Sequence, residues 1–217
     1  MPETVENRER LLDLARDGAL RGHRYRDLAG SGLSLERPDF EGATFERVTL
    51  DHAELRAAQL GGVTFTRADL RGAHLDASVL LRTAFTDSDL TEADLGGAHI
   101  EDALITRVPL MNASFAGARL VSTRFAASNM ARARFDGGVL IKCSFAFSPS
   151  GIESLQRASF VGATLIECDL SEASMIGADL RGALLLKCNL RGAQLTRALL
   201  DECRLLACDT TSADLPA

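Results

Sequence analysis

The sequence predicts an all-β protein in which the chain coils around its own core, with four short sides in each turn. Three observations predict this fold: a large apolar residue at almost every fifth position, a small residue two places before it, and a spacing of twenty between like residues. Internal repeats of this kind decide the architecture before local propensity does.

The large residue is Leu, Phe, Ile or Met at 34 of the 36 positions whose numbers are multiples of five, from Phe40 to Leu215, and only Ser150 and Thr210 differ. The residue two places earlier is small in 34 of 35 cases, with Glu153 as the exception. A period of five makes neither a stripe on an α-helix nor a single face on a straight strand. Each pentapeptide is therefore expected to be a short extended side followed by a corner, with the small and the large residue pointing inward.

Four sides per turn follow from the residues that recur at intervals of twenty. One such column holds five phenylalanines and one isoleucine, and three cysteines show the same spacing: Phe45, Phe65, Phe85, Ile105, Phe125 and Phe145; Cys168, Cys188 and Cys208. Like residues are expected to stack between successive turns, which lie about 4.8 Å apart in a parallel ladder.

Several units over residues 40–215 resemble the pentapeptide-repeat family, whose pattern is A(D/N)LXX. They are Ala68-Asp69-Leu70-Arg71-Gly72, Ala93-Asp94-Leu95, Ala178-Asp179-Leu180-Arg181-Gly182 and Ala193-Gln194-Leu195. The resemblance implies a right-handed quadrilateral β-helix with a rigid, regularly spaced surface. Leucine-rich repeats, the nearest rival at a period of about twenty, lack a large residue at every fifth position.

The chain is expected to divide into an N-terminal helix and capping segment at 1–35 and a β-helix at 36–217. Residues 5–19 read as the helix, with Thr4 as its N-cap and one apolar face formed by Leu11, Leu14, Ala15 and Ala19. Such a helix would cap the first coil, because an open end exposes apolar side chains and unpaired backbone groups.

The C-terminal end shows no comparable helix, although topoisomerase-targeting members of the family typically dimerise through one. Leu205, Leu206 and Leu215 run almost to the last residue. Either the tail 212–217 closes the final coil, or two molecules meet end to end. We expect a homodimer in which these three leucines form the contact.

The repeat lapses at residues 146–157, which contain Pro149, Gly151 and Glu153. Because the period of five resumes at Phe160, the interruption has the length of two pentapeptides. It forms either a bulged half coil or a ten-residue loop that extends from one corner. The segment is either a tolerated insertion or a partner-binding loop, and the candidate contacts are Phe147, Pro149, Ile152 and Glu153.

No catalytic, cofactor-binding or metal-binding site is expected, and the protein is not predicted to be an enzyme. The five cysteines occupy the small inward position, where they act as core fillers, although stacked thiols could also form a disulfide or bind a metal. The four histidines are scattered, and neither a hydrolase motif nor a phosphate-binding loop is present.

The net charge of −6 argues against direct binding to nucleic acid or to an anionic membrane. Neither an apolar run of about 20 residues nor a signal peptide is evident, so a cytoplasmic location is expected.

Two surface features are candidate partner-binding sites. Six acids lie between Arg82 and Arg107 with no Lys or Arg among them, and they are expected to form one acidic face: Asp87, Asp89, Glu92, Asp94, Glu101 and Asp102. Arginines dominate the next stretch, from Arg107 to Arg134, so the alternative is an ordinary mixed surface. An apolar stripe is expected at outward or corner positions, where a partner, a loop or the N-terminal segment would cover it: Val79, Leu81, Val121, Val139 and Ile141.

Two functions are consistent with these features. The resemblance implies a DNA mimic that binds gyrase or topoisomerase IV through its acidic residues and protects it from a quinolone or a natural-product poison, in antibiotic resistance or self-immunity. The alternative is a protein-interaction scaffold or regulator, unrelated to DNA, that binds its partner through the apolar stripe and the loop.

Overall fold

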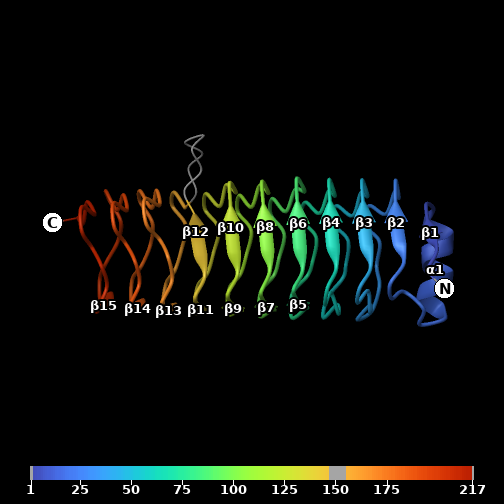
Figure 1. The fold of residues 1–217 in the computed structure, drawn as a ribbon, viewed down its shortest axis with the longest axis horizontal. Helices are drawn as coiled ribbons and strands as arrows, with labels where there is room; N and C mark the ends of the chain where they lie inside the picture. The colour runs from blue at the N-terminus through green and yellow to red at the C-terminus, as the bar shows by residue number, and fades with distance from the viewer. Residues whose placement is uncertain (1, 147–154, 217) are drawn as a thin grey trace.

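The computed structural model describes residues 2–146 and 155–216, and the chain there winds into a rod of stacked coils (Figure 1). Strands of successive coils pair in parallel, so the predicted all-β quadrilateral β-helix is confirmed. Two of its four sides are long sheets. The first long sheet has eight strands: β1 (Thr4–Val5), β2 (Arg24–Arg26), β3 (Thr44–Glu46), β4 (Thr64–Thr66), β6 (Ala84–Thr86), β8 (Leu104–Thr106), β10 (Arg124–Ala126) and β12 (Ser144–Ala146).

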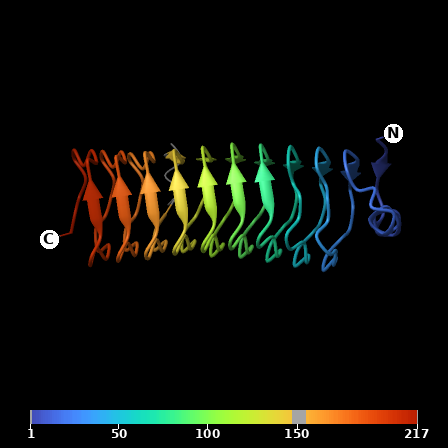
Figure 2. The same cartoon turned by 90° about the horizontal axis from the view of Figure 1, so that it is seen from below.

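The second long sheet has seven strands, which form another side of the rod (Figure 2): β5 (Val79–Leu81), β7 (His99–Glu101), β9 (Arg119–Val121), β11 (Val139–Ile141), β13 (Thr164–Ile166), β14 (Leu184–Leu186) and β15 (Arg204–Leu206). The other two sides are held by single parallel bridges between coils. We call them the Asp89 side, which includes the bridge Asp69↔Asp89, and the Asp94 side, which includes His74↔Asp94.

The corners explain how a period of five can close a coil. The residue two places after each large apolar residue adopts a positive φ, which turns the chain. Glycine accommodates this conformation without a Cβ clash, as at Gly97, where φ is 63°. Other corners hold residues with side chains in the same region, such as Ala77 at φ 58° and Asp87 at φ 52°.

The predicted aromatic column lies inside the rod. Ring centroids of Phe45 and Phe65 are 4.7 Å apart, and those of Phe65 and Phe85 are 4.8 Å apart. Ile105 lies between Phe85 and Phe125 in this column and pairs with both, as the spacing of twenty predicts. All of these side chains are almost completely buried.

A second aromatic stack is only partly evident from the sequence. Phe115 stacks on Phe135, and Phe135 stacks on Phe160, with both centroid separations 4.9 Å. The second step is one pentapeptide longer than the first because the interrupted coil is longer than the others. A search at intervals of twenty therefore finds Phe115 and Phe135 but misses Phe160.

The small inward positions also hold polar groups that bond between coils. The hydroxyl groups of Ser78 and Thr83 donate to the carbonyl groups of Leu55 and Leu60, at 3.3 and 2.8 Å. Cys168 and Cys188 occupy the equivalent position, with thiols 3.4 and 3.5 Å from carbonyl oxygens of the preceding coil. All five cysteines are free, and the role of core filler fits the three that are buried, Cys143, Cys168 and Cys188.

The N-terminal helix is shorter than expected. Helix α1 spans Arg8–Arg16, and its N-cap is Asn7, whose side chain accepts a hydrogen bond from the Arg10 N–H at 2.8 Å. Thr4, predicted as the cap, lies in β1 instead. The prediction failed there because Val5 is buried as a strand residue that pairs with Tyr25. Parallel pairing therefore begins on the N-terminal side of the predicted β-helix boundary at residue 36.

The interruption adds one pentapeptide to a coil, not two. Phe145 pairs with Phe125 at the usual spacing of twenty, whereas Val139 pairs with Thr164, five positions further along than that spacing would give. The buried Leu155 begins the next side ten positions after Phe145, where five is normal. The extra pentapeptide thus falls between Phe145 and Leu155, and the described residues on either side keep their register. Residues 147–154 lie outside the described part of the chain.

The two ends of the rod differ. Leu11 and Leu14 of α1 are buried at the N-terminal end. At the C-terminal end β15 is the last strand of the second long sheet, and Leu200 and Leu205 are only partly buried. The Asp214 carboxylate accepts hydrogen bonds from the Leu195 N–H and the Thr196 hydroxyl, so the tail closes one corner of the final coil and leaves the apolar end open.

Candidate partner-binding surfaces

The six predicted acidic residues do not share one face. They belong to one coil and its corners, so the chain carries them around the rod. Asp89 lies on the Asp89 side and Asp94 on the Asp94 side, whereas Glu101 lies in β7 of the second long sheet. Acids that are close in the sequence of a solenoid are therefore distributed around the rod. Acids that share one face must instead be spaced by the length of one coil.

Two of the six acids lie beside a basic side chain. The Arg107 guanidinium donates to both oxygens of Asp87, at 2.6 and 2.9 Å, and these bonds hold the pKa of Asp87 below its ordinary value. His99 Nε2 lies 3.4 Å from a Glu101 oxygen. Asp87, which pairs with a permanently charged guanidinium, is therefore a poor candidate for a binding surface that relies on free negative charge.

Of the other four acids, Asp102 is exposed at the corner that follows β7. The remaining three surround a different corner, which we call the acidic corner: Asp89, Glu92 and Asp94. No ion pair to any of the three is present among the described residues. Glu92 is exposed at the turn, and Asp89 and Asp94 flank it on the two adjoining sides. The Asp89 carboxylate accepts the Thr91 N–H at 2.8 Å, and the Asp94 carboxylate accepts the Gly96 N–H at 2.9 Å, so both side chains are fixed to the backbone.

Neighbouring coils extend the acidic corner, and sequence reasoning missed these residues because they lie outside the acidic run. Asp69 is the ladder partner of Asp89, although its carboxylate bonds to the Arg71 guanidinium, which lowers the pKa of Asp69. On the other side, Asp76 and His74 lie close to Asp94. The signal available in the sequence was the interval of twenty, as in Asp69 and Asp89.

The apolar stripe does lie on one face. Val79 and Leu81 are in β5, Val121 is in β9, and Val139 and Ile141 are in β11, all in the second long sheet. These five side chains are half-buried. β7, with the polar residues His99 and Glu101, interrupts the stripe between β5 and β9.

The stripe continues toward the C-terminus, which the sequence analysis did not anticipate. Ile141 pairs with Ile166, Ile166 with Leu186, and Leu186 with Leu206. The interval from Ile141 to Ile166 is one pentapeptide longer than the other two intervals. A search of the sequence at intervals of twenty therefore does not find the continuation. α1 lies at the opposite end of the rod from β13, β14 and β15 (Figure 2), so it does not cover this part of the stripe.

The other predicted contacts have different outcomes. Phe147, Pro149, Ile152 and Glu153 lie outside the described residues. At the C-terminal end, Leu206 and Leu215 are 40% and 43% exposed, while Leu205 is partly buried.

Two of the buried cysteines have thiols whose pKa is raised. Hydrogen bonding with Cys143 and burial raise the pKa of Cys168 to about 12, and hydrogen bonding with Cys168 and burial raise the pKa of Cys188. A thiol with a raised pKa is neutral near pH 7, and the thiolate is the reactive form.

No helix in the described part of the chain is both long enough and apolar enough to cross a membrane.

Comparison with known proteins identifies the repeat. The family model described as pentapeptide repeats matches in eight copies, over residues 31–67, 68–107 and 154–185. Among curated proteins no significant match is found.

Three solved structures illustrate the likeness. QnrB1, a plasmid-mediated fluoroquinolone resistance protein, is 19% identical, with 88% of this chain and 92% of that chain covered and a TM-score of 0.57. A pentapeptide-repeat protein from the Arabidopsis thaliana thylakoid lumen is 31% identical over 54% of this chain and 68% of that chain, with a TM-score of 0.39. HetL, involved in heterocyst differentiation regulation in the cyanobacterium Nostoc, is 24% identical over 91% of this chain and 94% of that chain, with a TM-score of 0.28.

The low identity to QnrB1 means that the likeness concerns the fold alone. The family matches, in contrast, cover just over half of the sequence and coincide with the coils of the rod. The chain is a right-handed quadrilateral β-helix and belongs to the pentapeptide-repeat family.

Proposed function

We propose that this protein is a non-enzymatic DNA mimic that binds a type II topoisomerase, gyrase or topoisomerase IV, and protects it from a poison in antibiotic resistance or self-immunity. The proposal rests on the family, some of whose members have this role, and on the acidic corner. In this role the protein acts in the cytoplasm and does not itself bind nucleic acid.

The acidic corner is the observation that carries the proposal. Asp89, Glu92 and Asp94 present carboxylates on a stiff scaffold, and hydrogen bonds to the backbone hold two of them in place. Fixed negative charges on a rod can compete for a basic groove built for phosphates, because binding then needs little reorganisation.

Binding to purified gyrase and topoisomerase IV tests the proposal. We expect duplex DNA to compete with the protein, and binding to weaken at least about tenfold between about 50 and 200 mM salt. The double variant Asp89→Asn with Glu92→Gln should weaken binding, since it removes two charges without changing side-chain size.

A matched control comes from the C-terminal coils. Asp169 and Glu172 occupy the same positions within the pentapeptide as Asp89 and Glu92, but on a different side of the rod: Asp169 bridges Ser144 of β12. The Asp169 carboxylate likewise accepts a backbone N–H, that of Ser171, at 3.1 Å. Asp169→Asn with Glu172→Gln removes the same charge away from the acidic corner. Equal loss in both double variants would argue for net charge alone and against the acidic corner.

The apolar stripe supports a second candidate, a protein-interaction scaffold unrelated to DNA. Its continuation through Ile166, Leu186 and Leu206 gives it more length than the sequence indicated. The affinity of a partner bound there would change little with salt concentration, because salt screens interactions between charges and not the burial of apolar surface. Val121→Asp would weaken such binding and leave a DNA mimic's binding to topoisomerase unchanged.

We also propose that two molecules associate through their C-terminal coils. The partly buried Leu200 and Leu205 end the core, and β15 is the last strand of the second long sheet in the described part of the chain. A second copy would cover both the apolar end and the strand edge. Light scattering after size exclusion should give twice the chain mass, and Leu205→Arg should give a folded monomer. A wild-type monomer at concentrations of about 100 μM would contradict this association, since obligate dimers hold together well below that level.

A further inference from the structure

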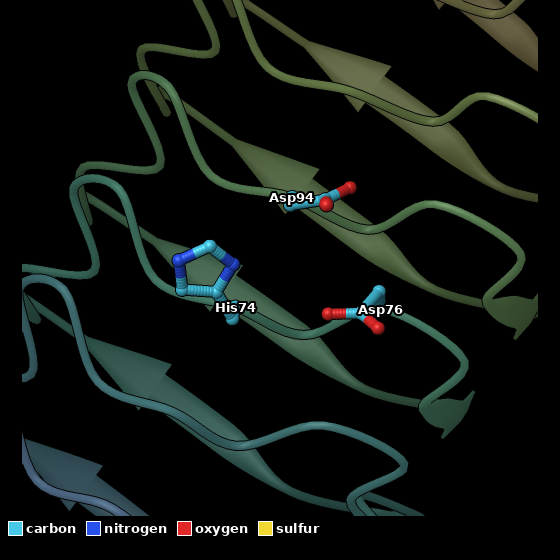
Figure 3. Close-up of side chains that lie close together, drawn as sticks. All are labelled: His74, Asp76 and Asp94. Carbon is cyan, nitrogen blue, oxygen red and sulfur yellow. The ribbon is translucent and has the colours of Figure 1, made fainter.

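The Asp94 side holds a compact group of side chains that the proposed function does not use as a group: His74, Asp76 and Asp94. His74 and Asp76 extend from one coil, and Asp94 extends from the next (Figure 3). One donor atom from each residue lies within 4.8 Å of the donor atoms of the other two. The parallel bridge His74↔Asp94 fixes the distance between the two coils at this point.

Two atoms in the group lack the partners that buried polar atoms ordinarily have. Within the described residues, His74 Nδ1 and Asp76 Oδ1 are buried and accept or donate no hydrogen bond. The Arg56 Nε lies 3.3 Å from Asp76 Oδ1, close enough for charge attraction but outside hydrogen-bond geometry. Asp94 uses one carboxylate oxygen to accept the Gly96 N–H, which leaves its second oxygen available to a ligand.

A carboxylate also lies near the other nitrogen of the His74 ring. Glu54, its ladder partner in the preceding coil, places a carboxylate oxygen 3.7 Å from Nε2. The carboxylate lies on the Nε2 side of the ring, and Nδ1 is the buried nitrogen without a partner on the side of the aspartates. A histidine that binds a metal through one nitrogen is commonly held by a carboxylate at the other.

We propose that His74 Nδ1, Asp76 and Asp94 bind a divalent transition-metal ion, for which Zn²⁺ is the best fit. One imidazole and two carboxylates form the borderline donor set that Zn²⁺ accepts, and water completes the tetrahedron. Bond lengths of about 2.0 to 2.2 Å place the donors of such a site about 3.4 Å apart, so rotations of the side chains close it without moving the coils.

The charges around the group set the strength of the site. Glu54 adds a third carboxylate, whereas Arg56 lies 3.4 Å from Glu54 and 3.3 Å from Asp76 and competes with a cation for both. A groove of about 520 Å³ begins beside Asp76 and gives water access to this part of the side. Arg56 therefore acts as an internal competitor, and its removal is expected to strengthen metal binding.

Calorimetric titration of the full-length protein with Zn²⁺ tests the site. We expect one equivalent in the wild type, at least about tenfold weaker binding in His74→Gln and in Asp94→Asn, and tighter binding in Arg56→Gln. His99→Gln is the matched control, because His99 also lies beside a carboxylate but has no second acid grouped with it among the described residues.

Nuclear magnetic resonance of the histidine side chains provides a readout that does not depend on heat. Added Zn²⁺ should shift the His74 Nδ1 resonance and leave His99 unmoved. Loss of binding in His99→Gln, unchanged binding in His74→Gln, or weaker binding in Arg56→Gln would overturn the proposal. Failure of this proposal and failure of the topoisomerase proposal can be told apart, since the double variant that tests topoisomerase binding leaves His74, Asp76 and Asp94 in place.

Discussion

At the residue scale, the rod is held by like side chains stacked at the interval between coils. Phe85 shows what one member contributes: its ring lies 4.8 Å from that of Phe65, at an interplanar angle of 2°, and the side chain is completely buried. Its other neighbour in the ladder is Ile105. Offset stacking adds to the burial of a large apolar surface, so each ring links two coils.

Phe85→Ala should lower the free energy of unfolding by about 3 to 5 kcal/mol, because a rigid coil cannot collapse around the cavity. Phe85→Leu keeps most of the volume and should cost less than about 1.5 kcal/mol. Urea unfolding followed by circular dichroism measures both. Equal losses in the two variants would show that stacking geometry, and not the cavity, dominates.

The cysteines allow a second prediction at this scale. Cys143, Cys168 and Cys188 are buried, whereas Cys203 and Cys208 are partly exposed, so exposure decides which thiols a reagent can reach. At pH 8 a thiol reagent should modify only Cys203 and Cys208 in the native protein, and all five thiols after denaturation. Rapid modification of Cys168 in native protein would contradict the buried ladder.

At the element scale, the unit is a short extended side and a corner with positive φ. The fold could be predicted closely from the sequence because every side repeats this unit. Each side requires a small and a large inward residue, as at Ala68 and Leu70. Local exceptions were harder to predict. Thr4 resembles an N-cap, but burial of Val5 in β1 places it in a strand and leaves the cap to Asn7.

At the Gly97 corner, the free-energy cost of a positive φ can be measured without a steric clash. Its φ is 63°, and an added Cβ would have no atom within 4 Å, so Gly97→Ala should cost about 1 to 2 kcal/mol from backbone strain alone. Ala77 adopts φ 58° at the same corner of the preceding coil, and Ala77→Gly should cost nothing or stabilise. Thermal unfolding of the two variants measures the difference, and a destabilising Ala77→Gly would contradict the strain argument.

At the scale of the whole molecule, the surface was less predictable than the core. Inward positions depend on the period of five, which survives the interruption, whereas faces depend on the interval between coils, which lengthens there by one pentapeptide. The stripe was therefore found only as far as Ile141, and its continuation at Ile166 was missed. The acidic run was wrongly grouped as one face for a related reason: neighbours in sequence wind around the rod.

The central claim is that this rod protects a type II topoisomerase. Supercoiling by gyrase, and decatenation by topoisomerase IV, should be measured with and without a poison while purified protein is titrated. We expect the protein to restore activity in the presence of the poison at low dose, and to inhibit the enzyme at higher dose as it competes with DNA. No effect on either enzyme across the titration would contradict the claim and favour the scaffold that binds through the apolar stripe.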